Sequence, residues 1–243
     1  MSFESINAHH GLGLAAAGLS SFFWTVTYVL ILVRGFRDRT FGMPLAALAA
    51  NLAWEVVFLA DTLAIGAYDE RLAMILPWTL LDLGIVWQCF AYGRGDFRDP
   101  MIRRFFHAGL IGMMAFAAVL LLALVRELQD AIGWYVAFGQ NLMMSILFLA
   151  LLLRRNDVRG QSVYIALAKL LGSLFAFAMA LFWSPRSLHE HWATLLPDRY
   201  YPIAPLLVTL YCGIFLFDVL YLLLLLGKHR ELGSSPWRWS RGA

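Results

Sequence analysis

Residues 110–125 read LIGMMAFAAVLLLALV, a stretch with no charged side chain and no alternation of polar and apolar residues. A second stretch, LYLLLLLG at 220–227, has the same character. A strand of a membrane barrel alternates with a period of two residues, whereas a helix that crosses the hydrocarbon layer needs about 20 mostly apolar residues. These stretches therefore predict membrane-spanning helices.

The rest of the chain has a similar composition. Of its 243 residues, 61% are hydrophobic and only 14% are charged, whereas a soluble domain is about 45–50% apolar and about 25% charged. We expect an all-α membrane protein, a bundle of seven transmembrane helices that forms a single domain over residues 1–243. The predicted spans are about 14–33, 43–65, 74–93, 105–125, 132–153, 161–183 and 203–226.

The basic residues predict the orientation of this bundle. Fourteen Lys and Arg residues fall in the C-terminal tail and in the loops after the first, third and fifth spans, against four in the loops on the other side. Because basic loops stay in the cytoplasm, we expect the N-terminus outside and the C-terminus in the cytoplasm. Basic residues spread over short loops also argue against a nucleic-acid partner.

The two cysteines and the N-terminal segment add little. Cys89 and Cys212 lie within apolar runs, so they predict neither a disulfide framework nor a zinc motif. The N-terminal segment lacks the basic region and the cleavage site of a signal peptide. The first span is therefore expected to be retained as a helix.

Four ionisable residues lie well inside the predicted spans, where charged groups are costly and are functional candidates by default. Glu55 lies in the second span and Asp82 in the third, Lys169 lies in the sixth and Asp218 in the seventh, and Asp61 lies closer to a membrane edge. Each could also be structural, because a buried carboxyl can hydrogen-bond to a neighbouring helix. In particular, Asp82 could orient Glu55 or pair with Lys169, and Lys169 could serve as a counter-ion.

Neutral polar and aromatic residues accompany these groups. Asn51 precedes Glu55 by four residues, so the amide and the carboxyl share a helix face. Tyr221 follows Asp218 by three residues and shares its face in the same way. We expect the supporting or cavity-lining residues to be Asn51, Trp54, Asp82, Gln140, Lys169 and Tyr221, with Asn141 and Ser145 as further hydrogen-bonding groups.

Two carboxyl groups in an apolar, aromatic-rich interior suit acid chemistry on a hydrophobic substrate. Two acids that share a dry site cannot both ionise cheaply, so the site holds a protonated acid at neutral pH. General-acid catalysis requires such a group. Aromatic faces stabilise a carbocation, and exclusion of water protects it from capture. A proton-coupled transporter would use similar residues, so both functions stay open on these grounds.

Five segments lie in order on the second, third, fifth, sixth and seventh predicted helices: NLAWE at 51–55, WTLLD at 78–82, GQNLMMS at 139–145, GQSVYIALAKLLGS at 160–173 and FDVLY at 217–221. Through them the chain resembles the integral-membrane terpene cyclases of fungal meroterpenoid and indole-diterpenoid biosynthesis and their bacterial relatives. The resemblance covers nearly the whole length and implies the same bundle of seven helices.

The resemblance also implies a reaction and its catalytic residues, Glu55 and Asp218. An acid protonates an epoxide or an alkene of a prenyl chain, and the chain then cyclises as a cation until it loses a proton or is captured internally. The resemblance implies no metal and no other cofactor, and the sequence lacks the DDxxD and DxDD runs of soluble terpene cyclases. The implied partners are a hydrophobic prenylated small molecule and the lipid bilayer, either the cell membrane of a bacterium or the endoplasmic reticulum of a fungus.

Two other functions are compatible with some of these residues. A transporter could use the same carboxyls, although the sequence shows no internal repeat, and Pro77 and Pro205 lie near the starts of spans. A retinal photoreceptor needs a Schiff-base lysine in its last span, where this chain has Asp218, while Lys169 lies in the sixth span.

The loop before the last span holds one further candidate. His189, Glu190 and His191 have a spacing that could bind a metal, but we expect them to be solvated at the level of the lipid headgroups. The segment DRYYPIAP at 198–205 could instead cap the cavity from the non-cytoplasmic side.

Overall fold

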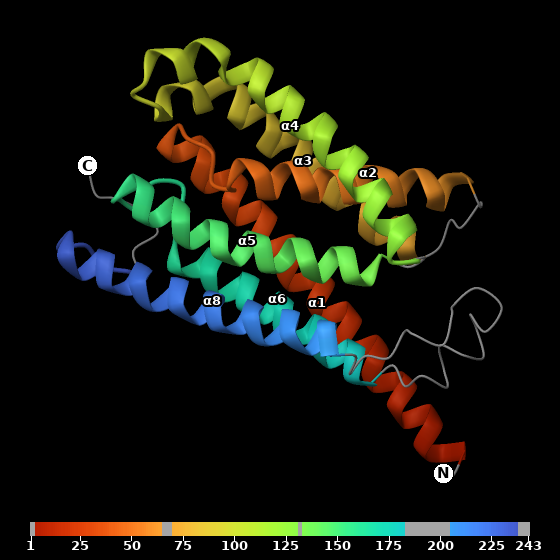
Figure 1. Cartoon of the computed structure of the whole chain (residues 1–243). Helices are drawn as coiled ribbons and strands as arrows, with labels where there is room; N and C mark the ends of the chain where they lie inside the picture. The colour runs from red at the N-terminus through yellow and green to blue at the C-terminus, as the bar shows by residue number, and fades with distance from the viewer. Residues whose placement is uncertain (1–2, 65–69, 131–132, 183–204, 238–243) are drawn as a thin grey trace.

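A computed structural model describes residues 3–64, 70–130, 133–182 and 205–237 (Figure 1). The candidate metal-binding residues 189–191 and most of the segment 198–205 lie outside the described residues. Every secondary-structure element of the described residues is a helix. These are α1 (Phe3–Asp38), α2 (Leu45–Ala64), α3 (Glu70–Tyr92), the 3₁₀ helix η1 (Gly93–Asp96), α4 (Pro100–Glu127), α5 (Trp134–Arg155), α6 (Val163–Phe182) and α8 (Pro205–Glu231).

All seven α-helices of the described residues are long and apolar enough to cross a membrane, which confirms the predicted multi-pass membrane protein. The helices run past several predicted limits, because the backbone hydrogen-bond ladder continues into polar residues that a hydrophobic pattern leaves out. The first helix, predicted over 14–33, extends from Phe3 to Asp38. Pro77, placed near the start of a span by the sequence, lies in the interior of α3 because that helix begins at Glu70.

Six of the helices form a closed ring. Following the helices that pack together, α1 contacts α6, α6 contacts α8, α8 contacts α5, α5 contacts α2, α2 contacts α3, and α3 returns to α1. The remaining helix, α4, packs mainly on the outside of α2 and lies at the edge of the bundle opposite α8 (Figure 1). The ring encloses buried side chains, and it brings together residues from distant parts of the chain.

The outer surface of the bundle is apolar. On α4 only Phe106, Leu110 and Leu121 are buried, while Phe116 is 65% exposed. On α8, Leu216 is 63% exposed. A soluble protein rarely exposes apolar side chains on this scale, and a lipid environment accounts for them.

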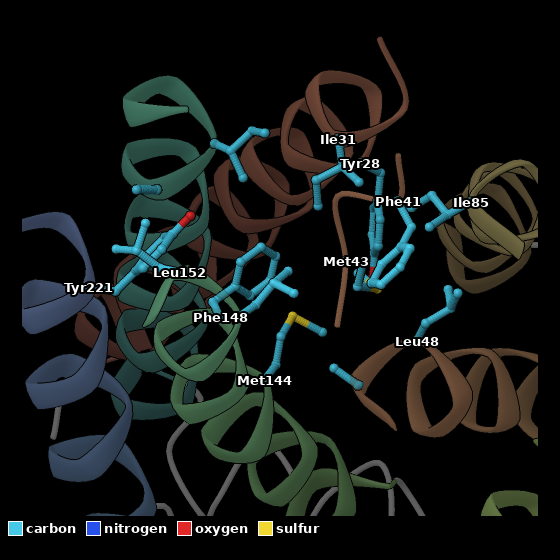
Figure 2. Packing of buried hydrophobic residues seen from close by; sticks show 14 of the residues in the cluster. Tyr28, Ile31, Phe41, Met43, Leu48, Ile85, Met144, Phe148, Leu152 and Tyr221 are labelled. Carbon is cyan, nitrogen blue, oxygen red and sulfur yellow. The ribbon is translucent and has the colours of Figure 1, made fainter. Parts of the chain in front are cut away.

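The buried apolar side chains form three clusters. The large core cluster joins α1, α2, α3, α4, α5, α6 and α8, and its labelled members include Tyr28, Leu48, Ile85, Phe148 and Tyr221 (Figure 2). A second cluster lies among α2, α3, α4 and α5 around Phe58, and a third lies among α5, α6 and α8 around Tyr211. The large core cluster therefore fills the end of the bundle near the basic loops. The second and third clusters lie separately toward the other end.

Buried polar contacts close the basic end of the bundle. Arg155, the last residue of α5, forms a salt bridge with Asp96 of η1, and their side chains are only 3% and 4% exposed. The same guanidinium donates hydrogen bonds to the Thr40 hydroxyl and the Phe41 carbonyl, both at 2.9 Å. Gly160 completes this contact, because its φ of +70° and a Cβ only 2.9 Å from the Phe41 carbonyl would strain any other residue. We call these five residues the loop cluster.

Candidate active site

The intramembrane polar residues lie at the level where the core divides. On α2, Glu55 comes between Leu48 of the large core cluster and Phe58 of the second cluster. On α8, Asp218 comes between Tyr221 of the large core cluster and Ile214 of the third cluster. The large core cluster therefore lies between these polar groups and the basic loops.

The first polar group, which we call the carboxyl cluster, consists of Tyr28, Asn51, Glu55 and Asp82. The Asn51 side-chain nitrogen lies 2.9 Å from Glu55 Oε1, 2.8 Å from Asp82 Oδ2 and 2.6 Å from the Tyr28 hydroxyl oxygen. Three helices supply these groups, and the spacing of four residues on α2 aligns Asn51 with Glu55 as the sequence predicts. The two carboxyl oxygens are therefore neighbours across a single nitrogen atom.

Both carboxyls are buried, with exposures of 1% for Glu55 and 0% for Asp82. Within the described part of the chain, neither forms an ion pair, and Glu55 Oε2 and Asp82 Oδ1 have no hydrogen-bond partner. An amide nitrogen has two hydrogens and can serve only two of its three neighbouring oxygens at once. No basic side chain of the described residues pairs with either acid, so two negative charges at this buried site would repel each other. One proton shared between the two carboxyls is therefore favoured, and such a pair can act as a general acid.

The second polar group, which we call the lysine cluster, consists of Asn141, Ser145, Lys169 and Asp218. Lys169 Nζ donates to Asp218 Oδ1 at 2.6 Å, to the Ser145 hydroxyl at 2.7 Å and to Asn141 Oδ1 at 3.3 Å. Asn141 is held in turn by a hydrogen bond that it donates to the Ser173 hydroxyl at 3.0 Å. The three hydrogens of the ammonium group are thus fully used, and its charge is balanced by one carboxylate.

Aromatic side chains of α1 and α3 connect the two clusters. The centre of the Trp24 ring lies 5.8 Å from Lys169 Nζ and 6.1 Å from the centre of the Tyr28 ring, and the centre of the Trp78 ring lies 6.3 Å from that of Tyr28. Trp24 and Tyr28 share a face of α1 because they are four residues apart. Their rings give the interior an electron-rich wall that can stabilise a cation.

The structure divides the predicted site residues between the two clusters. Glu55 has Asp82 as its acidic neighbour, and Asp218 has Lys169 as its partner, so the two predicted catalytic acids belong to separate clusters. Gln140 reaches the carboxyl cluster through a hydrogen bond to Asn51 Oδ1 at 3.3 Å.

The remaining predicted residues lie at or beyond the edge of these clusters. The Trp54 indole donates to the carbonyl of Gly133 at 3.2 Å and packs beside Phe58, which places it outside both polar clusters. Tyr221 is buried one turn from Asp218, and its hydroxyl has no hydrogen-bond partner among the described residues. Asp61 is exposed.

Two residues of α1, Trp24 and Tyr28, belong to or border the carboxyl cluster but were not predicted as site residues from the sequence. The signal available was their spacing of four residues within an apolar span. Aromatic residues in such spans usually serve packing, so this spacing alone does not mark a site.

The ring of helices and its buried carboxyl cluster define a polytopic membrane protein with an acidic interior site. The family model of the Pyr4-like transmembrane terpene cyclases matches residues 10–231. The chain belongs to this family of membrane terpene cyclases.

Individual relatives agree with this assignment. The chain is 31% identical over 156 residues to the Pyr4-family terpene cyclase mfmH of Annulohypoxylon moriforme, a match that covers 63% of each chain and so less than two thirds of the relative. It is 30% identical over 222 residues to the terpene cyclase ascF of Acremonium egyptiacum, covering 82% of this chain and 77% of the relative. It is 27% identical over 166 residues to asnovolin H synthase nvfL of Aspergillus novofumigatus, covering 64% of each. No solved structure matches the chain. These comparisons do not favour the transporter that the sequence left open.

Proposed function

We propose that the protein cyclises a prenylated hydrophobic substrate within the membrane, and that the Glu55–Asp82 pair supplies the proton that starts the reaction. The observation that carries this proposal is the approach of two buried carboxyls to one Asn51 nitrogen, while no basic side chain of the described residues forms an ion pair with either. The family and its named terpene cyclases support the reaction class. No metal enters the proposed mechanism.

The proton passes from the carboxylic acid to the oxygen of a terminal epoxide on the prenyl chain. The bond between that oxygen and the more substituted carbon breaks, the oxygen becomes a hydroxyl, and the carbon becomes cationic. The electron pair of the next double bond in the chain then closes the first ring. An epoxide oxygen can accept a hydrogen bond before the proton moves, so a carboxylic acid suits an epoxide better than an isolated alkene.

Asn51 and Tyr28 hold the acid ready for this step. The amide nitrogen stabilises whichever carboxyl oxygen becomes negative as the proton leaves, and charge-assisted hydrogen bonds of this kind are stronger than neutral ones. The hydroxyl of Tyr28, 2.6 Å from the same nitrogen, places a third polar group of fixed position beside the two acids. Such preorganised dipoles act strongly in an interior that excludes water.

The test uses membranes that contain the full chain and a phenol that carries a farnesyl chain with a terminal epoxide. We expect Glu55→Gln and Asp82→Asn each to slow consumption of this compound by about 10²- to 10⁴-fold, because each removes a member of the acid pair. Asp61→Asn is the matched control, since it removes an exposed acid from the same helix as Glu55.

Folding of each variant is checked by its melting temperature in detergent. Consumption at the wild-type rate by folded Glu55→Gln protein would show that the proton comes from elsewhere.

A further inference from the structure

We infer that Asp218 is the base that ends the cyclisation, taking a proton from the carbon skeleton, and that Lys169 positions it for this step. The inference rests on the proposed function, because it needs a carbocation generated in the same interior. It assigns different chemical tasks to the two predicted catalytic acids, and it names the product class as a cyclic alkene.

The first support is the environment of the Asp218 carboxylate. One oxygen, Oδ1, accepts the hydrogen bond from Lys169 at 2.6 Å, and the two side chains are only 2% and 1% exposed. The other oxygen, Oδ2, is buried and has no hydrogen-bond partner in the described part of the chain. Buried polar atoms are nearly always satisfied in folded proteins, so one that is not calls for a functional explanation.

The second support is the difference in charge between the clusters. The carboxyl cluster brings two acids together, and no basic side chain in the described part of the chain pairs with them, so the cluster favours holding a proton that it can give away. The lysine cluster pairs one acid with one ammonium, so its carboxylate is already balanced and has an oxygen available to receive a proton. An acid and a base of the same residue class can work in one interior because their surroundings differ.

The third support is the position of the clusters relative to the aromatic wall. Trp24 lies 5.8 Å from Lys169 Nζ and 6.1 Å from the Tyr28 ring, so the same indole borders both clusters. The Tyr221 hydroxyl, one turn after Asp218, is a second buried oxygen on this side, besides Asp218 Oδ2, that has no hydrogen-bond partner among the described residues. A prenyl chain whose first cation forms beside Glu55 can therefore carry its last cation toward Asp218 along aromatic surface.

The step balances without a co-reactant. The C–H bond next to the final cationic carbon breaks, its electron pair forms a carbon–carbon double bond, and the proton moves to Asp218 Oδ2. The proton gained by Asp218 equals the one lost by the Glu55–Asp82 pair, so the turnover consumes no net proton. Asp218 touches the reacting atoms and is the catalytic residue of this step, whereas Lys169 acts through it.

The experiment separates initiation from termination by measuring two quantities on the epoxyfarnesyl phenol. Consumption of the epoxide reports initiation, and the fraction of product that is a cyclic alkene rather than a water-captured alcohol reports termination. We expect Asp218→Asn to keep consumption well above the level of a variant that has lost its general acid, whose loss is about 10²- to 10⁴-fold, while the alkene fraction falls and alcohols accumulate. Lys169→Met should change the alkene fraction in the same direction, and Asp218→Glu should restore it in part.

The matched control for the lysine is Lys228→Met. Lys228 is also buried and forms an ion pair, with Glu231 at 2.8 Å, but it lies at the far end of α8 near the basic loops. Its variant should show the wild-type alkene fraction. If single variants at 169 or 218 do not fold, the double variant Lys169→Met/Asp218→Asn removes both charges together and is measured in their place, since replacing a whole buried pair is better tolerated than breaking it.

Two results would overturn the inference. A folded Asp218→Asn protein that loses epoxide consumption as completely as Glu55→Gln would place Asp218 in initiation. An unchanged alkene fraction in Asp218→Asn, or in the double variant, would place the base elsewhere. Failure of the proposed acid pair gives a different result, namely full consumption by Glu55→Gln whatever the product ratio.

Discussion

Gln140 and Asn141 are consecutive residues of α5, yet their side chains hydrogen-bond into different polar clusters. Gln140 donates to Asn51 of the carboxyl cluster, and Asn141 accepts from Lys169 of the lysine cluster. Successive side chains on a helix point about 100° apart, so one turn of α5 serves both sides of the ring. The two clusters are therefore held at a fixed separation by a single rigid element.

This relationship predicts a specific effect of Gln140→Leu. Asn51 Oδ1 would lose the hydrogen bond from Gln140, so the Asn51 amide would rotate more freely and would hold the Glu55 and Asp82 carboxyls less firmly. We expect epoxide consumption to fall by up to roughly tenfold, since a net hydrogen bond is worth about 0.5–1.5 kcal/mol, with no change in the alkene fraction. Met143→Leu on the same helix should leave both quantities as in wild type. A changed product ratio in Gln140→Leu would contradict the separate tasks of the two clusters.

Tyr28→Phe removes one hydroxyl from the carboxyl cluster and keeps the aromatic ring. We expect a loss of consumption of up to roughly tenfold, on the scale of one hydrogen bond, and an unchanged melting temperature because the ring still packs in the large core cluster. Tyr92→Phe, at the end of α3, is the control. A rate equal to wild type in Tyr28→Phe would show that the hydroxyl has no part in proton delivery.

The loop cluster predicts a stability effect that is independent of chemistry. Asp96→Asn leaves the Arg155 guanidinium buried without its carboxylate, and removing one partner of a buried ion pair costs about 3–5 kcal/mol. We expect a large drop in melting temperature in detergent. The comparison is Asp157→Asn, because Asp157 pairs with Arg159 at 2.8 Å on the surface, where such a pair is worth about 0–1 kcal/mol. Equal melting temperatures for the two variants would contradict a stabilising role for the loop cluster.

Gly172 sets the distance between α1 and α6. A Cβ at this position would approach Trp24 Cδ1 to 2.9 Å, and the Gly172 carbonyl accepts a hydrogen bond from Ser20 at 2.9 Å. We expect Gly172→Ala to displace Trp24 from Lys169 and to lower both stability and the alkene fraction. Gly112→Ala on α4, where a Cβ meets nothing within 4 Å, should be neutral or slightly stabilising, by up to about 1 kcal/mol. Wild-type behaviour of Gly172→Ala would show that the tryptophan can move without consequence.

The number and type of the helices could be predicted because each span carries its own signal. An apolar run such as 110–125 requires a helix whatever its neighbours are. Helix ends could not be placed as well, because α1 and α8 continue through residues whose polarity resembles that of a loop. The orientation of the bundle rests on the count of basic residues alone and stays a prediction.

The site was only partly predictable, because pairing depends on which helices adjoin. The sequence marked Glu55, Asp82, Lys169 and Asp218 as costly in a membrane, but it left Asp82 with two possible partners. The ring decides between them, since α3 lies beside α2, whereas α6 lies beside α8. The catalytic roles of Glu55 and Asp218 stay predictions.

The ion pair between α6 and α8 also constrains how the chain is made. Lys169 and Asp218 lie in separate spans, 49 residues apart, and a lone charged residue at the centre of a span costs about 2.5–3.5 kcal/mol on insertion from the translocon. Neither charge is neutralised until both helices are in place, so α6 depends for its final position on a helix that is synthesised after it. The Lys169–Asp218 pair can therefore form only after α8 has been inserted. A nascent chain that ends before α8 would keep the Lys169 ammonium group without its carboxylate partner.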